Sequence, residues 1–269
     1  MLESALQKRI RNKQLRDGLL KMATVKAVIF DFIGTLADVE NYDLEFSKMK
    51  LHEAIRQTGF NIDAKSFLKA YTEAHEKYRL LRYRKLVEVT NAAWISEALN
   101  NLGFKTKQED ARIKSAVNVF FEDYLGSLKL RPSVKRMLNW ACNEYKLGLI
   151  SNFTCAPVIY AGVKRLGIDK FFNAVVVSDA VGWRKPHAKI FETALKKLDV
   201  HAGETVCVGD CPREDIRGAK AVGMKTVFVP SQFYSYENLV ESREKPDFVV
   251  ESTGELCKKL PVFIQELRC

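Results

Sequence analysis

The chain lacks the marks of three large protein classes. None of its apolar runs approaches the roughly 18 residues that a membrane span needs, so we predict a soluble protein without a membrane partner. Its six cysteines include no C-x-x-C pair and no neighbouring His at zinc-ligand spacing, which favours reduced thiols in a cytoplasmic protein. Internal repeats and low-complexity stretches are missing too, which argues against a repeat protein.

A continuous basic stripe is also missing, although the formal net charge is +10. Residues 1–26 hold seven Lys or Arg against two acidic residues, which is half of that net charge, and the rest is spread over the remaining chain. Binding to a nucleic-acid backbone depends on a concentrated basic surface. We therefore predict no nucleic-acid partner.

The basic segment at residues 1–22 does not have the pattern of a secretory leader, because charged residues interrupt its apolar positions throughout. Met22 directly precedes the run A-T-V-K-A-V-I-F-D, which ends at Asp31. We interpret residues 1–22 as an extension ahead of the first domain. It is either an added helix, a product of start-site choice, or an Arg-rich leader for an organelle.

Most of the chain alternates between strand-like and helix-like patterns. The β-branched apolar residues 25–30 predict a buried strand, and from Pro132 onward further strand-like runs alternate with helices of about ten residues. This alternation predicts an α/β fold with a doubly wound parallel sheet, formed by residues 23–40 and 127–269. Residues 230–245, rich in Ser, Tyr and Glu, resemble a flexible loop.

Residues 41–126 follow a different pattern. Apolar residues recur there at three- and four-residue spacing, as in Trp94, Ala98 and Leu102, which predicts about four helices. An insertion directly after the first strand lies over the carboxyl edge of the sheet. We therefore expect an inserted, all-helical cap domain.

Four short stretches each place a polar or charged residue just past an apolar run. In chain order they are A-V-I-F-D-F-I-G-T-L (27–36), L-G-L-I-S-N (147–152), W-R-K-P (183–186) and V-G-D-C-P-R-E-D (208–215). The carboxyl ends of parallel strands meet at one edge of a sheet, where α/β proteins bind their ligands. The polar residues of these stretches are thus expected to meet at that edge.

Together the four stretches resemble the signature of the haloacid dehalogenase superfamily, in the subgroup with a helical cap after the first motif. The resemblance covers the chain from Met22 onward and implies a phosphatase-type hydrolase. D-F-I-G-T resembles the family's D-x-D-G-T, which makes Asp31 the nucleophile that attacks phosphorus and forms an aspartyl phosphate. Gly34 and Thr35 belong to the turn that binds the phosphoryl group.

The second and third motifs imply further groups for an anionic substrate. Ser151 matches a hydroxyl that donates to a phosphoryl oxygen, and Asn152 beside it is a further candidate for substrate binding. Lys185 matches an ammonium group that offsets the repulsion between Asp31 and the incoming anion.

The fourth motif supplies Asp210 and Asp215, five residues apart across a turn from strand to helix. Hard carboxylate oxygens in this arrangement suit Mg²⁺. The resemblance adds the Asp31 carboxylate and the backbone carbonyl of Ile33 as ligands. We therefore expect Mg²⁺ as the cofactor.

Ile33 departs from the family pattern, because phosphatases of the family carry a second Asp at this position. That Asp protonates the leaving oxygen and later activates water, and general acid–base catalysis of this kind is worth about 10²–10⁴-fold. The favoured hypothesis is a Mg²⁺-dependent phosphomonoesterase for a small phosphorylated metabolite that is slow, prefers good leaving groups, or takes an acid from the substrate or the cap.

Two other hypotheses stay open. The first is a phosphonoacetaldehyde hydrolase-like enzyme, which would need a lysine of the cap for a Schiff base, with Lys50 near His52 as a weak candidate. The second is a non-hydrolytic protein that binds phosphorylated ligands or a partner. Haloacid dehalogenases proper are disfavoured, because they carry no metal and lack the G-D-x-x-x-x-D pattern.

The cap contains the run Y-R-L-L-R-Y-R-K at residues 78–85. If this run faces the cleft between cap and core, its basic residues could hold a second anionic group of a substrate. The default interpretation is a solvated helix face with its tyrosines packed inward. The sequence predicts neither the identity of the substrate nor the oligomeric state.

Overall fold

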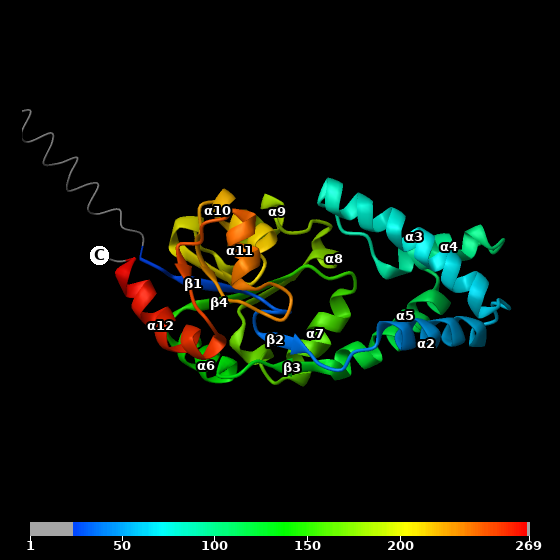
Figure 1. Ribbon diagram of the computed structural model, residues 1–269, viewed down its shortest axis with the longest axis horizontal. Coiled ribbons are helices and arrows are strands. Elements are labelled where there is room, and N and C mark those ends of the chain that lie inside the picture. Colours follow the sequence, from blue (N-terminus) through cyan, green and yellow to red (C-terminus); the bar gives the residue numbers. More distant parts are fainter. Residues whose placement is uncertain (1–23, 268–269) are drawn as a thin grey trace, which may run out of the picture.

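The computed structural model describes residues 24–267, in which a sheet-based core and a helical cap lie side by side (Figure 1). The predicted extension, residues 1–22, lies outside the described residues. None of the described helices is long and apolar enough to cross a membrane.

The core is built on one sheet of six parallel strands, in the order β5-β4-β1-β6-β7-β8. β1 therefore lies inside the sheet, between β4 and β6. The strands are β1 (Ala27–Asp31), β4 (Lys146–Ser151), β5 (Ala174–Val177), β6 (Thr205–Gly209), β7 (Lys225–Phe228) and β8 (Phe248–Val249). The predicted doubly wound α/β fold is confirmed.

Helices cover both faces of this sheet, because both faces of its strands are apolar. On β1, Val28 and Phe30 pack into one buried cluster and Ala27 and Ile29 into the opposite one. Residues of α6 (Val134–Glu144), α7 (Ala156–Arg165) and α12 (Thr253–Glu266) complete the first cluster. The second is completed by α9 (Ala188–Leu198) and α10 (Arg217–Ala221). The short helix α8 (Ser178–Val181) follows β5.

The prediction of a loop over residues 230–245 was wrong in part, because α11 (Tyr236–Ser242) lies within it. The Ser235 hydroxyl accepts from the Asn238 backbone N–H, and the Asn238 side chain accepts from the backbone N–H of Ser235. Leu239 packs into a small buried cluster with Ile216 and Phe228. A reciprocal N-terminal capping box and one buried leucine thus stabilise a helix in a segment whose composition predicts a loop.

The cap consists of α2 (Leu44–Gln57), α3 (Ala64–Lys85), α4 (Asn91–Asn101) and α5 (Ala111–Ser127). Each helix begins after an Asp or Thr whose side chain accepts a backbone N–H of the first turn. Phe67, Trp94 and Leu99 are fully or almost fully buried in a hydrophobic cluster that the cap helices form, with Val158 of α7 at its border to the core. The inserted all-helical cap is therefore a packed unit whose hydrophobic cluster comes almost entirely from its own helices.

A two-stranded antiparallel ribbon joins the cap to the core. β2 (Ala37–Val39) leads out of the core, β3 (Leu128–Leu130) leads back, and Ala37 pairs with Leu130. We did not predict this ribbon, because three residues are too few to establish a period. It holds the two crossings between core and cap together, directly after the first motif.

Candidate active site

Three of the four motifs place a residue at the carboxyl end of a strand, and these ends lie at the same edge of the sheet. Asp31 closes β1, Ser151 closes β4, and Asp210 directly follows β6. In the register of the sheet, Asp31 pairs with Ile150, so Ser151 lies one residue beyond the nucleophile candidate on the adjacent strand. The structure therefore brings these residues together as the sequence predicts.

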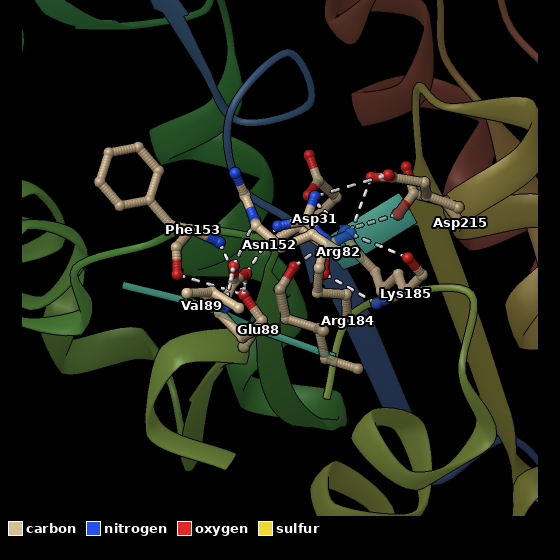
Figure 2. A network of polar contacts seen from close by, with 12 residues as sticks. Asp31, Arg82, Glu88, Val89, Asn152, Phe153, Arg184, Lys185 and Asp215 are labelled. Atoms are coloured by element: carbon tan, nitrogen blue, oxygen red, sulfur yellow. Dashed lines mark hydrogen bonds and ion pairs between the residues drawn. The ribbon is translucent and has the colours of Figure 1, made fainter. Parts of the chain in front are cut away.

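Lys185 lies between two carboxylates (Figure 2). Its ammonium group donates to Asp31 Oδ1 at 2.5 Å and to Asp215 Oδ1 at 2.6 Å. It also donates to the Ile150 carbonyl at 3.2 Å. Burial disfavours the ammonium, but the charges of Asp215 and Asp31 outweigh this and raise the pKa of Lys185 well above its usual value. Lys185 is therefore a fixed positive charge beside the nucleophile candidate.

Asp31, Asp210 and Asp215 form a buried acidic cluster in which one oxygen from each carboxylate lies within 4.8 Å of the others. Burial raises the pKa of Asp31 to about 7, against the attraction of Lys185 and with added repulsion from Asp215. Burial, with the charges of Asp31 and Asp215, also raises the pKa of Asp210. Lys185 thus compensates only part of the cluster's negative charge.

The donor set fits a small, hard divalent cation. Three carboxylates converge around one ammonium group, and Asp31 Oδ2 is buried without a hydrogen-bond partner. An unpartnered buried carboxylate oxygen is costly, and oxygen-only ligand sets suit Mg²⁺. Asp31, Asp210 and Asp215 are therefore the side chains that would hold such a cation.

Two glycines allow this close packing. Gly34 has φ +95°, and a Cβ there would lie 2.2 Å from Asp210 Oδ2. A Cβ on Gly209 would lie 2.4 Å from the Asp215 side chain. Neither position accepts a larger residue without displacing a carboxylate of the acidic cluster.

The candidates for substrate binding lie at the site, with partners of their own. The Thr35 hydroxyl is buried and donates to Asp210 Oδ1 at 3.4 Å, and the Gly34 N–H donates to the Ala37 carbonyl. Asn152 accepts from the backbone N–H of Lys185 at 2.8 Å, and donates to the Lys185 carbonyl at 3.0 Å and to Glu214 Oε2 at 2.8 Å. This geometry makes Asn152 a clamp on the Lys185 loop.

Ile33 is half-buried and packs against the core. The nearest downstream carboxylates in the sequence are Asp38 and Glu40. Asp38 Oδ1 lies 3.5 Å from Arg131 Nε in an ion pair, and Glu40 is exposed. Neither forms a hydrogen bond or ion pair with Asp31, in line with our leaving the acid role unassigned.

Two residues of the site were not identified from the sequence. Ser231 donates to Asp210 Oδ2 at 2.5 Å, from the loop after β7. Arg131 donates to the Gly34 carbonyl at 2.5 Å and to the Pro230 carbonyl at 2.8 Å, and so ties the first-motif turn to the same loop. Both lie outside the four motifs. Ser231 is 21 residues from Asp210, and Arg131 is 97 and 99 residues from Gly34 and Pro230, so no local pattern points to them.

A buried ion network connects the site to the cap (Figure 2). The Glu88 side chain, only 1% exposed, accepts from Arg82 Nε at 2.7 Å and from Arg184 at 2.6 Å. The Ser178 hydroxyl also donates to Glu88, at 2.5 Å. Arg184 directly precedes Lys185, so this network fixes the loop that carries the buried lysine.

A cavity of about 280 Å³ lies where the cap meets the core. Asn152, Phe153 and Thr154 line it from the core, and Arg82 lines it from α3. Half of the described residues that line it are aromatic: Tyr42, Tyr71, Trp94, Phe120, Phe121, Tyr124 and Phe153. We name it the cap cavity.

The run at 78–85 matches neither interpretation fully. Arg79, Arg84 and Lys85 are exposed, as on a solvated face, but Tyr83 is 44% exposed instead of packed inward. Arg82 is buried and reaches the cap cavity. One of the four basic residues therefore faces the cleft.

The phosphonatase-like hypothesis loses its candidate lysine. Lys50 forms ion pairs with Asp123 at 3.0 Å and with Glu122 at 3.3 Å, and these contacts raise its pKa. A Schiff-base lysine needs a lowered pKa. His52 is buried with Nε2 2.9 Å from the Ile62 carbonyl, so it packs within the cap.

Comparison with known proteins decides the family. A family model described as haloacid dehalogenase-like hydrolase matches residues 25–223. The chain belongs to this family. The resemblance in the four motifs is thus confirmed, and the protein is a hydrolase of this family.

Two curated relatives of the hydrolase are archaeal phosphatases. Glyceraldehyde 3-phosphate phosphatase of Pyrococcus abyssi is 32% identical, over 76% of this chain and 81% of the relative. Ribulose-1,5-bisphosphate 5-phosphatase of Halopiger xanaduensis is 26% identical, over 86% of this chain and 95% of the relative. Among solved structures, 2-haloacid dehalogenase of Pseudomonas syringae matches with a TM-score of 0.63 at 23% identity, covering 90% of this chain and 99% of that one. The last similarity supports the fold alone.

Proposed function

We propose that this hydrolase is a Mg²⁺-dependent phosphomonoesterase that cleaves small phosphorylated metabolites through an aspartyl phosphate on Asp31. The observation that carries the proposal is the position of Lys185 between Asp31 and Asp215, with Asp210 completing the acidic cluster. The names of the two curated phosphatases, both of which act on small phosphorylated sugars, support the same class of substrate.

Each residue has a role in this proposal. One oxygen of the Asp31 carboxylate attacks phosphorus, while the other is left for the metal. The bond from phosphorus to the leaving oxygen breaks, and the leaving oxygen takes a proton from solvent. Lys185 and the Ser151 hydroxyl stabilise the negative charge on the phosphoryl oxygens. Water then attacks phosphorus, phosphate leaves, and the Asp31 carboxylate is regenerated.

A bound Mg²⁺, held by Asp31, Asp210, Asp215 and the Ile33 carbonyl, would neutralise charge on the phosphoryl group as it is transferred. The Asp210 carboxylate is fixed for this purpose by Thr35 and Ser231.

The test is a phosphate-release assay on the full chain with Mg²⁺, against a panel of phosphorylated metabolites that includes sugar phosphates and acetyl phosphate. We expect release that chelation of the metal abolishes, together with a hydroxylamine-sensitive phosphoryl adduct on Asp31 in mass spectrometry. Asp31→Asn is expected to lose both. Ligand-induced thermal stabilisation without any release of phosphate would instead support the phospho-ligand-binding alternative.

A further inference from the structure

The cap cavity adjoins the catalytic edge of the sheet. Asn152 and Phe153, which line it, directly follow Ser151 at the end of β4. Tyr124 lines it from α5, and the Asp31 carboxylate is among the charges that raise the pKa of this tyrosine, after burial. A substrate with its phosphoryl group at Asp31 would therefore extend its leaving group into this cavity.

Aromatic rings form half of the lining of the cavity. Phe153 lies 5.2 Å from Tyr124 and 5.3 Å from Phe121 between ring centroids, and Tyr42 meets Tyr124 edge to face at 5.1 Å. Aromatic rings attract one another at centroid separations of about 4.5–7 Å, in offset or edge-to-face arrangements. A further ring entering the cavity would meet partners of both kinds.

The volume matches a single ring. An apolar cavity of about 150 Å³ is known to accommodate benzene. At about 280 Å³, the cap cavity has room for one ring and its substituents.

The polar groups of the cavity favour a ring that carries an acceptor. Lys48 and Arg82 line it, whereas no Asp or Glu within residues 24–267 does. The Trp94 indole N–H is buried and lies next to the Tyr71 hydroxyl, with which it interacts. An acceptor on a bound molecule would meet the positive charge of Lys48 and Arg82.

Ile33 favours the same class of substrate for an independent reason. Without an acid, the leaving oxygen departs with its electron pair and no proton. A phenolate has a conjugate acid of pKa about 10, by analogy with tyrosine. An alkoxide resembles hydroxide, which is a far stronger base than a phenolate. An aryl phosphate therefore needs the missing acid far less than an alkyl phosphate does.

We propose that the cap cavity binds the leaving group of monocyclic aryl phosphates that carry an acceptor substituent, and that the enzyme hydrolyses these in preference to alkyl phosphates of similar size. This inference rests on the proposed phosphomonoesterase function. In the reaction, the bond from phosphorus to the phenolic oxygen breaks and the bond from Asp31 to phosphorus forms. The phenolate takes a proton from solvent, and water then releases phosphate from Asp31.

The experiment compares kcat/KM of the full chain with Mg²⁺ for phenyl, benzyl, ethyl and acetyl phosphates. Benzyl phosphate separates ring binding from leaving-group chemistry, because it joins an aromatic ring to an alkyl leaving oxygen. We expect its KM to lie roughly tenfold or more below that of ethyl phosphate, because its ring is buried on binding. Phenyl phosphate is expected to exceed both in kcat.

A matched pair of variants tests whether the ring binds in the cap cavity. Leu44 and Met49 lie on α2 and are 45% and 46% exposed, but only Leu44 lines the cap cavity. Leu44→Trp fills part of the cavity, so we expect the benzyl-to-ethyl ratio of kcat/KM to fall toward one. Met49→Trp is expected to leave this ratio within twofold of the unmodified chain. Equal effects of the two variants would overturn the location.

A binding measurement with a phosphonate detects the ring in the cavity without hydrolysis. Benzylphosphonate is expected to quench tryptophan fluorescence through Trp94 and to bind at least tenfold more tightly than methylphosphonate. If acetyl phosphate is hydrolysed but benzyl compounds gain nothing over ethyl and methyl ones, the inference fails and the proposed function stands. If neither phenyl nor acetyl phosphate is hydrolysed, the proposed function fails with it.

Discussion

Replacing Ile33 by Asp tests whether the site lacks only its acid. The new carboxyl group would occupy the position from which phosphatases of the family protonate the leaving oxygen. General acid–base catalysis is worth about 10²–10⁴-fold, or roughly 3–5 kcal/mol of activation free energy. We expect kcat/KM for ethyl phosphate to rise by a factor in this range, and that for phenyl phosphate to rise much less.

The substitution also has a cost in stability. Ile33 is half-buried against the core, so its removal is expected to lower the free energy of unfolding by about 1–2 kcal/mol. A fourth carboxylate beside Asp31, Asp210 and Asp215 adds repulsion that Mg²⁺ relieves. The variant is therefore expected to depend on Mg²⁺ for stability more strongly than the unmodified chain.

Ile33→Asn is the matched control, because it removes the same apolar contacts without supplying a proton. The assay measures phosphate release from ethyl and phenyl phosphates at saturating Mg²⁺, with melting temperature as the check on folding. Two results would refute the reasoning. Rapid turnover of ethyl phosphate by the unmodified chain would mean that another group already acts as the acid. A folded, Mg²⁺-binding Ile33→Asp variant with no gain over Ile33→Asn would mean that the site does not cleave phosphate esters.

Three further predictions concern the metal site and the cap. Mg²⁺ at about 100 times its Kd is expected to stabilise the chain by about 2.7 kcal/mol in thermal unfolding, and Asp210→Asn to abolish the effect; no shift at millimolar Mg²⁺ would contradict the metal site. Ser231→Ala should weaken Mg²⁺ activation about 10–100-fold in a metal titration, because Asp210 loses its hydroxyl donor, whereas Ser231→Thr should retain affinity. Glu88→Gln should cost about 3–5 kcal/mol in urea unfolding, because two buried arginines lose their counter-ion. Glu76, which forms an exposed ion pair with Arg79, is the control: Glu76→Gln is expected to change the free energy of unfolding by no more than about 1 kcal/mol. Equal losses of stability in the two variants would contradict the role of the buried network.

The arrangement of strands was predictable, because a buried parallel sheet imposes apolar runs on its strands. The same regularity places Asp31, Ser151 and Asp210 at one edge, since each ends or follows a strand. Lys185 is different, because it reaches the edge from a loop. Only the resemblance to a known family pointed to it.

The supporting contacts were not predictable, because they join residues that no period or motif relates. Arg131 follows β3 and holds two turns that lie 97 and 99 residues away. Glu88 is a single acidic residue between two helices, and its burial against Arg184 appears only when cap and core are assembled. Composition predicts such residues to be exposed.

The same supporting contacts bear on what could replace the acid that is missing at Ile33. Asp38 is the nearest downstream carboxylate in the sequence, but it lies in an ion pair with Arg131, which also holds the Gly34 and Pro230 carbonyls. Moving Asp38 toward the phosphoryl site would take that counter-ion from the arginine that ties both turns together. Glu214 is engaged as well, by Asn152 and, at 3.8 Å, by Arg184. Because both carboxylates already stabilise the frame of the site, the simplest compensation for Ile33 lies in the substrate, as a leaving group that needs no proton.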